Sequence, residues 1–159
     1  FQQAFDPLLA PGMRNYWKSV NFDTLGDAAI DGLIAAAAAL PGPECEIFVA
    51  QLGGAMSRVD PAATPFVGRD VRFIMNVHGR WSDRRDDDAV RRWARRTFEA
   101  AVPHATGSGY VNFLTEDEAG RVAASYGSNH ARLQALKARF DPTNLFRMNL
   151  NIAPSAAGG

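Results

Sequence analysis

The longest alternating pattern of apolar and polar positions lies between residues 70 and 81. Alternation with a period of two is typical of a strand whose two faces meet different surroundings. One face would carry Phe73, Met75, Val77 and Trp81, and the other would carry Ile74, Asn76 and His78. We therefore predict a long strand with one apolar face and one partly polar face.

Apolar residues at helical spacing predict a helix directly after this strand. They recur three and four positions apart, and the aspartates at 86–88 precede them, where the helix dipole favours acids. The stripe consists of Val90, Trp93, Ala94, Thr97, Phe98 and Ala101. The arginines that flank it are expected to face solvent, because the aspartates offset their charge.

An earlier helix is predicted from the same spacing. It would end at Leu40, where prolines and a glycine follow, and Asp23 or Thr24 could cap its start. Its buried face would consist of Ile30, Leu33, Ile34 and Ala37.

A last helix is predicted from about Glu116 to Phe140, and Gly127 is a candidate interruption. This helix places the amide of Asn129 at the head of an otherwise apolar stripe. The stripe consists of Val122, Tyr126, Asn129, Leu133, Leu136 and Phe140.

Two more strands are predicted at 15–22 and 44–52, and residues 107–114 would form a short strand or an extended loop. The order of elements predicts an α+β fold, in which an antiparallel β-sheet has helices packed on one face. A C-terminal helix and a docking segment would follow. The other face of the sheet would be open, carry Asn76 and His78, and act as a ligand floor or an interface.

The end of the chain holds more apolar and amide residues than a solvated tail needs. Pro142 ends the last helix, because proline disfavours helical geometry in the residue before it. Beyond it, Leu145, Phe146, Met148, Leu150 and Ile152 are interleaved with Asn144, Arg147, Asn149 and Asn151. We therefore predict that residues 141–152 dock onto another surface.

Composition narrows the class of function. The 159 residues are 47% hydrophobic and include 17 basic and 17 acidic side chains. This suffices for one packed domain, and the zero net charge provides no global field for nucleic acid or an anionic membrane. A small molecule or a protein partner is the expected ligand.

The chain starts at Phe1 rather than at methionine, so we expect it to have been processed or cut from a longer protein. Residues 1–13 are expected to form an irregular lead-in. No apolar run reaches transmembrane length and no signal peptide is visible, which leaves the compartment open, with the cytoplasm favoured. Cys45 stands alone and is expected to be a buried thiol.

Few residues suggest a known type of chemistry. His78, His104 and His130 lie on different predicted elements and form no metal-binding motif, so no metal site is expected. Gly53 and Gly54 indicate a bulge or a tight exit from a strand rather than a phosphate loop.

Tyr110 is a candidate general base. Gly107 and Gly109 permit close backbone approach there, and a phenol accepts a proton if its pKa is lowered. A packed aromatic side chain is the alternative. A second set consists of amides near apolar faces: Asn112, Asn129, Asn149 and Asn151. Buried amides need partners, so they either cap turns or bind a ligand or another domain.

Several motifs stand in an order and spacing that resemble one family. They are Tyr16–Ser19, Gln51–Val59 with Pro61, Ala63–Phe66, Phe73–Trp81, Tyr110–Phe113, Tyr126–Leu133, Lys137 and Asp141–Arg147. Together they resemble the C-terminal part of the berberine-bridge-enzyme-like FAD-linked oxidases, which are flavoproteins of the vanillyl-alcohol-oxidase type. That part comprises the substrate-binding domain and the terminal segment.

The resemblance implies an FAD-dependent oxidoreductase. FAD would be bound mainly by an N-terminal FAD-binding domain that is absent from this chain, and Cys45 would not be the attachment point of the flavin. The substrate would be a small alcohol, sugar or secondary metabolite that loses a proton and passes a hydride to the flavin. Dioxygen would commonly reoxidise the flavin. The chain by itself would be inactive.

The resemblance also assigns site residues. Tyr110 matches a tyrosine that is the catalytic base in some members, and Asn112, Asn129 and Asn149 match positions at or near the flavin. Gln51, Asn76 and His78 are assigned to substrate binding. Residues 1–114 would be part of the substrate-binding domain, and residues 115–159 would form the helix and segment that return to the FAD domain.

Two positions depart from the family pattern. Gly68 stands where many relatives have histidine, and Leu150 stands where many have glutamine. The second change weakens one polar contact to the flavin domain. The alternative function is a stand-alone dimeric α+β ligand-binding module without catalysis, and the apolar and amide residues of 141–152 favour the enzyme.

Overall fold

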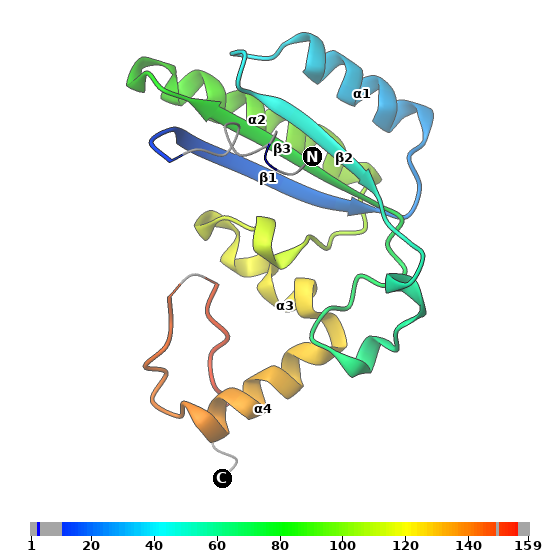
Figure 1. Ribbon diagram of the computed structural model, residues 1–159, viewed down its shortest axis with the longest axis vertical. Coiled ribbons are helices and arrows are strands. Elements are labelled where there is room, and N and C mark those ends of the chain that lie inside the picture. Colours follow the sequence, from blue (N-terminus) through cyan, green and yellow to red (C-terminus); the bar gives the residue numbers. More distant parts are fainter. Residues whose placement is uncertain (1–2, 4–10, 149, 156–159) are drawn as a thin grey trace.

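The computed structural model describes residues 3, 11–148 and 150–155. Three antiparallel strands, β1 (Arg14–Phe22), β2 (Glu46–Gln51) and β3 (Phe73–Trp81), form one sheet in the order β1-β3-β2 (Figure 1). Helices α1 (Asp27–Ala38) and α2 (Asp87–Ala101) pack on one face of it. This arrangement confirms the α+β fold. The predicted lead-in falls largely outside the described residues.

The strand register separates two sets of side chains. Val77 lies opposite Ile47 on β2, whereas Asn76 lies opposite Phe48. Directly opposed residues project to the same face of a sheet, so the alternation predicted for β3 is confirmed. The helix-covered face carries Met75, Val77 and Trp81, and the second face carries Ile74, Asn76 and His78.

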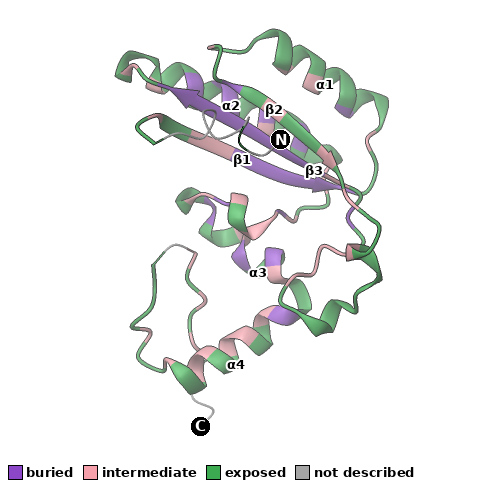
Figure 2. Ribbon diagram, viewed as in Figure 1, coloured by how far each residue is buried: buried purple, intermediate pink, exposed green. Residues whose placement is uncertain are grey.

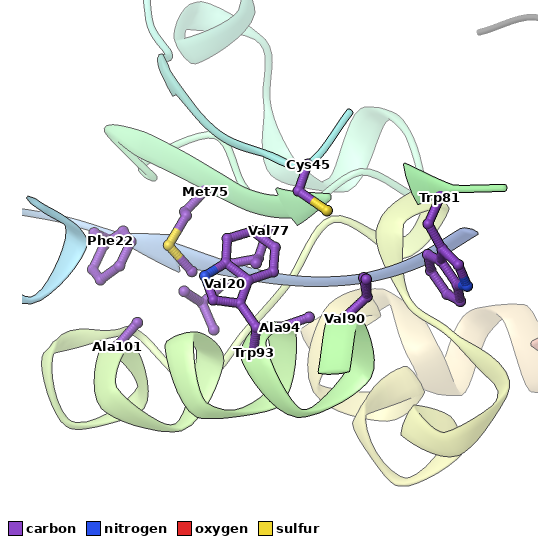
Figure 3. Close-up of a cluster of buried hydrophobic side chains, with 10 residues drawn as sticks. All are labelled: Val20, Phe22, Cys45, Met75, Val77, Trp81, Val90, Trp93, Ala94 and Ala101. Carbon is purple, nitrogen blue, oxygen red and sulfur yellow. The ribbon is translucent and has the colours of Figure 1, made fainter. Parts of the chain in front are cut away.

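The hydrophobic core lies between the sheet and α2 (Figure 3). Its buried members are Val20, Phe22, Cys45, Met75, Val77, Trp81, Val90, Trp93, Ala94 and Ala101. The stripe predicted on α2 is therefore confirmed, and Phe98 packs against the core from its edge. Trp93 Nε1 also donates a hydrogen bond to the carbonyl of Ala36, 3.0 Å away, which joins α2 to α1.

Gly79 allows α2 to lie close to the sheet. A Cβ atom at this position would collide with the side chain of Val90 and lie 3.0 Å from the carbonyl oxygen of Tyr16. Any larger residue would push the helix away from β3.

The face that α1 buries agrees with the prediction only in part, because Leu33 of the predicted face packs against the core. Ala29 is buried, whereas Ile30 and Ile34 are 40% and 62% exposed. The helix is so rich in alanine that apolar residues occur on every side of it, and hydrophobic spacing alone does not orient such a helix. Packing against α2 selects the side with the small Ala29.

The start of α1 also differs from the prediction. Gly26 is the N-cap, and no side chain caps the helix. Asp23 and Thr24 precede it, so their prediction as caps is wrong. Sequence alone places helix boundaries only to within a few residues.

The C-terminal third forms four short helical pieces instead of one helix. They are η8 (Glu116–Arg121), α3 (Val122–Tyr126), η9 (Gly127–Asn129) and α4 (His130–Phe140). The interruption at Gly127 is confirmed, because its φ of 48° lies in the left-handed region that favours glycine. Only the first part of the predicted stripe is buried, since Leu136 and Phe140 are 42% and 72% exposed.

Residues 107–114 form an extended loop, with a single 3₁₀ turn at η7 (Val111–Phe113). Its beginning lies along the edge of β1, where Asn21 N donates to the carbonyl of Ser108 and Thr106 N donates to the carbonyl of Asn21. Gly107, with a φ of 80°, turns the chain between these two bonds. The loop alternative is therefore the correct one.

No helix in the described part of the chain is long and apolar enough to cross a membrane.

Candidate functional site

A cavity of about 900 Å³ lies where the second face of the sheet meets two loops. Its floor is formed by cross-strand neighbours on that face: Asn21, Phe48, Ala50 and Ile74. Residues 64–71 and the segment between Thr106 and Phe113 form its walls, together with Ser125 and Tyr126 of α3. The second face was expected to be open. Its central side chains Asn76 and His78 are instead 7% and 6% exposed.

Tyr110 lines this cavity between two aromatic rings. Its ring centroid lies 5.1 Å from that of Phe113 and 6.2 Å from that of Phe66, and both contacts are edge-on. The phenol oxygen accepts a hydrogen bond of 2.8 Å from Asn112 Nδ2. This hydrogen bond fixes the phenol oxygen at the wall of the cavity.

The three asparagines assigned to the flavin have different surroundings. Asn112 bonds Tyr110, as described above. Asn129 is buried, and its Nδ2 donates to the carbonyls of Pro61 and Thr64 at 2.9 and 3.0 Å. Asn129 therefore fixes the loop that becomes a wall of the cavity. Asn149 lies outside the described residues.

Arg69 holds the same wall from its other end. Its guanidinium donates to the carbonyl of Met56 at 3.0 Å and to Thr64 Oγ1 at 2.6 Å. The guanidinium also lies 5.1 Å from the ring centroid of Phe66. These contacts fix Phe66 where it lines the cavity. No structural or functional role was predicted for Arg69 from the sequence.

Gly68, where many relatives have histidine, leaves room for Phe66. A Cβ atom at position 68 would lie 3.3 Å from Cζ of Phe66, which is tighter than an ordinary contact. A side chain at position 68 and the present position of Phe66 therefore compete for the same space.

The three residues assigned to substrate binding do not lie together. Gln51 is opposite Phe73, so it projects from the helix-covered face, whereas Asn76 and His78 project from the second face. None of the three is among the described residues that line the cavity. Asn76 is the nearest in the sheet, since it lies directly opposite Phe48 and two residues after Ile74 on the same face.

His78 is a buried imidazole that interacts with a carboxylate. Its Nδ1 lies 3.3 Å from Glu46 Oε1, and its ring centroid lies 4.9 Å from that of Trp17. Burial lowers the pKa of His78 and Glu46 only partly offsets this, so the ring is neutral at pH 7. If Nδ1 carries the proton toward Glu46, then Nε2 is an acceptor.

Side-chain atoms on this face without a hydrogen-bond partner among the described residues include Nε2 of His78 and Oδ1 of Asn76 and Asn21. Buried polar atoms nearly always have a partner. These atoms have bonding capacity left for water or for a group outside the described residues.

A buried charge network joins β1 to the C-terminal region. Lys18 Nζ lies 2.8 Å from Asp117 Oδ1 and 3.2 Å from Glu118 Oε2, and Arg121 pairs with Glu118. Burial alone would lower the pKa of Lys18, but these carboxylates raise it. This network was not predicted from the sequence. The available signals were a lysine within an apolar strand and the capping box that Thr115 and Glu118 form.

In the described part of the chain, no three histidine, cysteine or carboxylate side chains come together to hold a metal ion.

Comparisons of this chain with known proteins identify the family that it resembles. Residues 109–153 match the family model described as "Berberine and berberine like". The chain is 33% identical over 114 residues to the uncharacterized FAD-linked oxidoreductase YvdP of Bacillus subtilis, which covers 72% of this chain and 25% of the relative. It is 30% identical over 110 residues to chitooligosaccharide oxidase of Gibberella zeae, covering 64% of this chain and 22% of the relative.

The fold agrees with these matches. Berberine bridge enzyme from Eschscholzia californica superimposes with a TM-score of 0.83 over 92% of this chain and 34% of that chain, at 23% identity. The chain thus has the fold and sequence of part of an FAD-linked oxidoreductase. It belongs to the berberine-bridge-enzyme-like family. It spans about a quarter of the length of the curated relatives it matches.

Proposed function

We propose that the chain is the substrate-binding and C-terminal portion of an FAD-dependent oxidoreductase that oxidises an alcohol, sugar or secondary metabolite. The observation that carries the proposal is Tyr110 in the wall of a 900 Å³ cavity, with Asn112 donating to its phenol oxygen. Both residues lie in the region that matches the family. Relatives named chitooligosaccharide oxidase and aclacinomycin-N/aclacinomycin-A oxidase support oxidation as the reaction type.

In this proposal Tyr110 receives the proton of the substrate hydroxyl at its Oη atom. As a base it acts in its phenolate form, and the hydrogen bond from Asn112 Nδ2 holds its oxygen in place. Phe66 and Phe113 contact the ring edge-on and fix its orientation. A flavin held by the FAD domain would supply the hydride acceptor for the carbon that carries the hydroxyl, and dioxygen would be the final acceptor.

The residues present fit an FAD domain as the partner of this chain. The unpartnered acceptors of Asn76 and His78 call for donors from outside the described residues. Leu145, Phe146 and Met148 are 72%, 77% and 86% exposed and would lose that exposure against such a domain. We expect the chain without that domain to be inactive, because the flavin would lack most of its binding surface.

The experiment joins this chain to an FAD-binding domain in one protein and follows flavin absorbance in a single turnover. Replacing Tyr110 with Phe should slow flavin reduction by roughly 10²–10⁴-fold, the range lost with a general base. Tyr16→Phe is the matched control, since Tyr16 does not line the cavity. Unchanged reduction in Tyr110→Phe would remove the assignment as base, and a joined protein that never binds flavin would overturn the proposal.

The alternative, a stand-alone dimeric binding module, rests on the exposed edge of the sheet. Phe48 and Val49 of β2 are 48% and 39% exposed, and β2 pairs only with β3 among the described residues. Size-exclusion chromatography of the chain with and without residues 141–159 separates the two functions. A stable dimer that survives the truncation would favour the module, and a self-associating chain that the truncation makes monomeric would favour the enzyme.

A further inference from the structure

A partly buried arginine ties the loop that carries Tyr110 to the sheet. Arg121 Nη1 donates to the carbonyl of Ser19 on β1 at 3.0 Å, and Nη2 donates to the carbonyl of Ser108 at 3.1 Å. The planar guanidinium suits this double contact, because its nitrogens point in fixed directions. One side chain therefore joins the sheet to the backbone of the loop two residues before Tyr110.

Gly109 lets the guanidinium approach this backbone closely. A Cβ atom at position 109 would lie 3.0 Å from Nη2 of Arg121 and 3.2 Å from Cδ2 of Leu114, and both distances are tighter than ordinary contacts. Only a residue without a side chain fits between these groups without displacing one of them. Since Gly109 directly precedes Tyr110, a shift of the guanidinium moves the backbone from which the phenol extends.

The guanidinium is itself held on its other sides. Arg121 pairs with the carboxylate of Glu118, which is 5% exposed, and its guanidinium carbon lies 5.1 Å from the ring centroid of Phe98. Buried polar groups whose hydrogen bonds are made rigidify the structure around them. Arg121 is therefore a fixed anchor for the loop and not a mobile surface side chain.

The other end of the loop is tied to the same charges. The backbone N–H of Thr115 donates to Glu118 Oε2 at 3.1 Å, and the hydroxyl of Thr115 accepts from Lys18 Nζ at 3.1 Å. Lys18 Nζ also lies 3.2 Å from Glu118 Oε2. The segment between residues 108 and 115, which includes Tyr110, thus spans two anchors of one buried ion network.

We infer that Arg121 is a positioning residue, which acts through the carbonyl of Ser108 to place the phenol of Tyr110 for proton transfer. The inference rests on the proposed function for its catalytic meaning, because Tyr110 is the base only in that proposal. Arg121 is not among the described residues that line the cavity, so it acts on Tyr110 and not on the substrate. A reacting group that is misplaced by about 1 Å costs roughly 10²-fold in rate.

The first test measures the position of Tyr110 by NMR in the chain without flavin. Arg121→Lys keeps a positive charge beside Glu118 but loses the planar pair of nitrogens. The nuclear Overhauser contact between the rings of Tyr110 and Phe66, which lies outside the loop, should therefore weaken several-fold. Arg139→Lys, at an exposed position on α4, is the matched control and should retain the contact. An unchanged contact in a folded Arg121→Lys protein would overturn the inference.

A second variant decides if Arg121→Lys does not fold. Gly109→Ala retains the arginine but crowds its Nη2 atom, so it should weaken the same ring contact between Tyr110 and Phe66. Gly120→Ala is its matched control, because a Cβ atom at position 120 meets nothing within 4 Å. Equal ring contacts in the two glycine variants would overturn the inference.

The second test measures flavin reduction in the protein joined to an FAD-binding domain. Arg121→Lys should lower the limiting rate constant roughly 10²-fold, whereas the substrate concentration at half-saturation should stay within about twofold of the parent value. In a Tyr110→Phe background the same change should have no further effect, since Arg121 acts through Tyr110. A merely structural role would slow reduction by equal factors in both backgrounds, and that result would overturn the inference.

The two proposals fail separately in these tests. If Tyr110→Phe leaves flavin reduction unchanged, the assignment of Tyr110 as base fails, and the ring contact still decides whether Arg121 positions the phenol. If Tyr110→Phe slows reduction and Arg121→Lys does not, the proposed function stands and the role of Arg121 as a positioning residue fails.

Discussion

The sheet with α2 and the C-terminal arm, defined here as α4 and residues 141–148, bury their apolar residues to very different degrees (Figure 2). In the sheet and α2, Met75, Val77 and Ala94 are 0% exposed. In the arm, α4 has no buried residue, and Phe146 is 77% exposed. The first region contains its own core, whereas the second presents apolar side chains that the described chain does not cover.

The arm is nevertheless held in a defined conformation. The carboxylate of Asp141 accepts hydrogen bonds from the backbone N–H groups of Leu145 and Phe146 at 2.7 and 3.0 Å. Lys137 Nζ donates to Asp141 and to the carbonyl of Phe146. The exposed side chains thus project from a fixed backbone. The difference is therefore between a core that the chain covers by itself and an arm whose apolar side chains stay exposed on a fixed backbone.

The largest expected effect is the difference in unfolding free energy between truncating an aromatic side chain in the core and truncating one in the arm. Trp93→Ala removes a core side chain and its hydrogen bond to Ala36, so the free energy of unfolding should fall by about 3–5 kcal/mol. Phe146→Ala, the matched aromatic truncation in the arm, should change it by less than about 0.5 kcal/mol. Urea titration followed by circular dichroism measures both. Losses of similar size would show that the arm is packed as tightly as the core.

The second prediction compares the same substitution, glycine to alanine, at two positions where it should change the free energy of unfolding in opposite directions. Gly79→Ala should destabilise the chain by about 1–3 kcal/mol, because the added methyl group meets Val90 and the backbone of Tyr16. Gly32→Ala lies in α1, where a Cβ atom meets nothing within 4 Å, and should stabilise it by up to about 1 kcal/mol. The same urea titration measures both changes in the free energy of unfolding. A neutral Gly79→Ala would mean that α2 can shift away from β3 at no cost.

A smaller effect depends on pH and tests the contact between β1 of the sheet and η8, which precedes the arm in sequence. Burial alone would raise the pKa of Asp117, but hydrogen bonds from Lys18, Thr115 and Tyr16 outweigh it and lower the pKa to about 2. A carboxylate with a depressed pKa stabilises the fold above its ordinary pKa of 3.8, and this stability is lost as the pH falls from there toward about 2.

Asp117→Asn should therefore destabilise the chain at pH 6 and approach the parent stability at pH 2. Since Asp117 is 43% exposed, solvent screening limits the difference to about 1 kcal/mol. Asp31→Asn, at an exposed position on α1, is the control. Unfolding free energies measured between pH 6 and pH 2 should converge only for Asp117→Asn. A difference that does not vary with pH would contradict the ionic role.

The sequence was most informative where burial has a clear period. The alternation on β3 and the stripe on α2 were predicted correctly, because the apolar side chains of each element gather on the face that packs in the core. The prediction failed for α1, where alanine on all sides hides the buried face, and for the C-terminal third, where Gly127 and 3₁₀ turns divide the helix. The division of the chain at residue 114 stays a prediction.

The candidate site was only partly predictable. Tyr110 and Asn112 are two positions apart in sequence, so one motif identified both, and the structure adds their hydrogen bond. Asn21 and Ser125 lie 104 positions apart (125 − 21) and belong to no motif, so only the folded chain brings them to one cavity. Gln51 was grouped with Asn76 and His78 by family resemblance, and only the strand register shows that it projects from the opposite face.

The smallest expected change in stability belongs to a variant that tests whether the exposed side chains of the arm contact an FAD-binding domain. Phe146→Ser should alter the unfolding free energy of the chain by less than about 0.5 kcal/mol, because the side chain is exposed and Asp141 binds the backbone of this segment. In a protein that also contains an FAD-binding domain, the same variant should retain less flavin after gel filtration. Ile34→Ser is the matched control, since Ile34 is also exposed but lies on α1. If both variants lost flavin equally, exposed apolar residues in general, and not the arm, would be responsible for holding the domain.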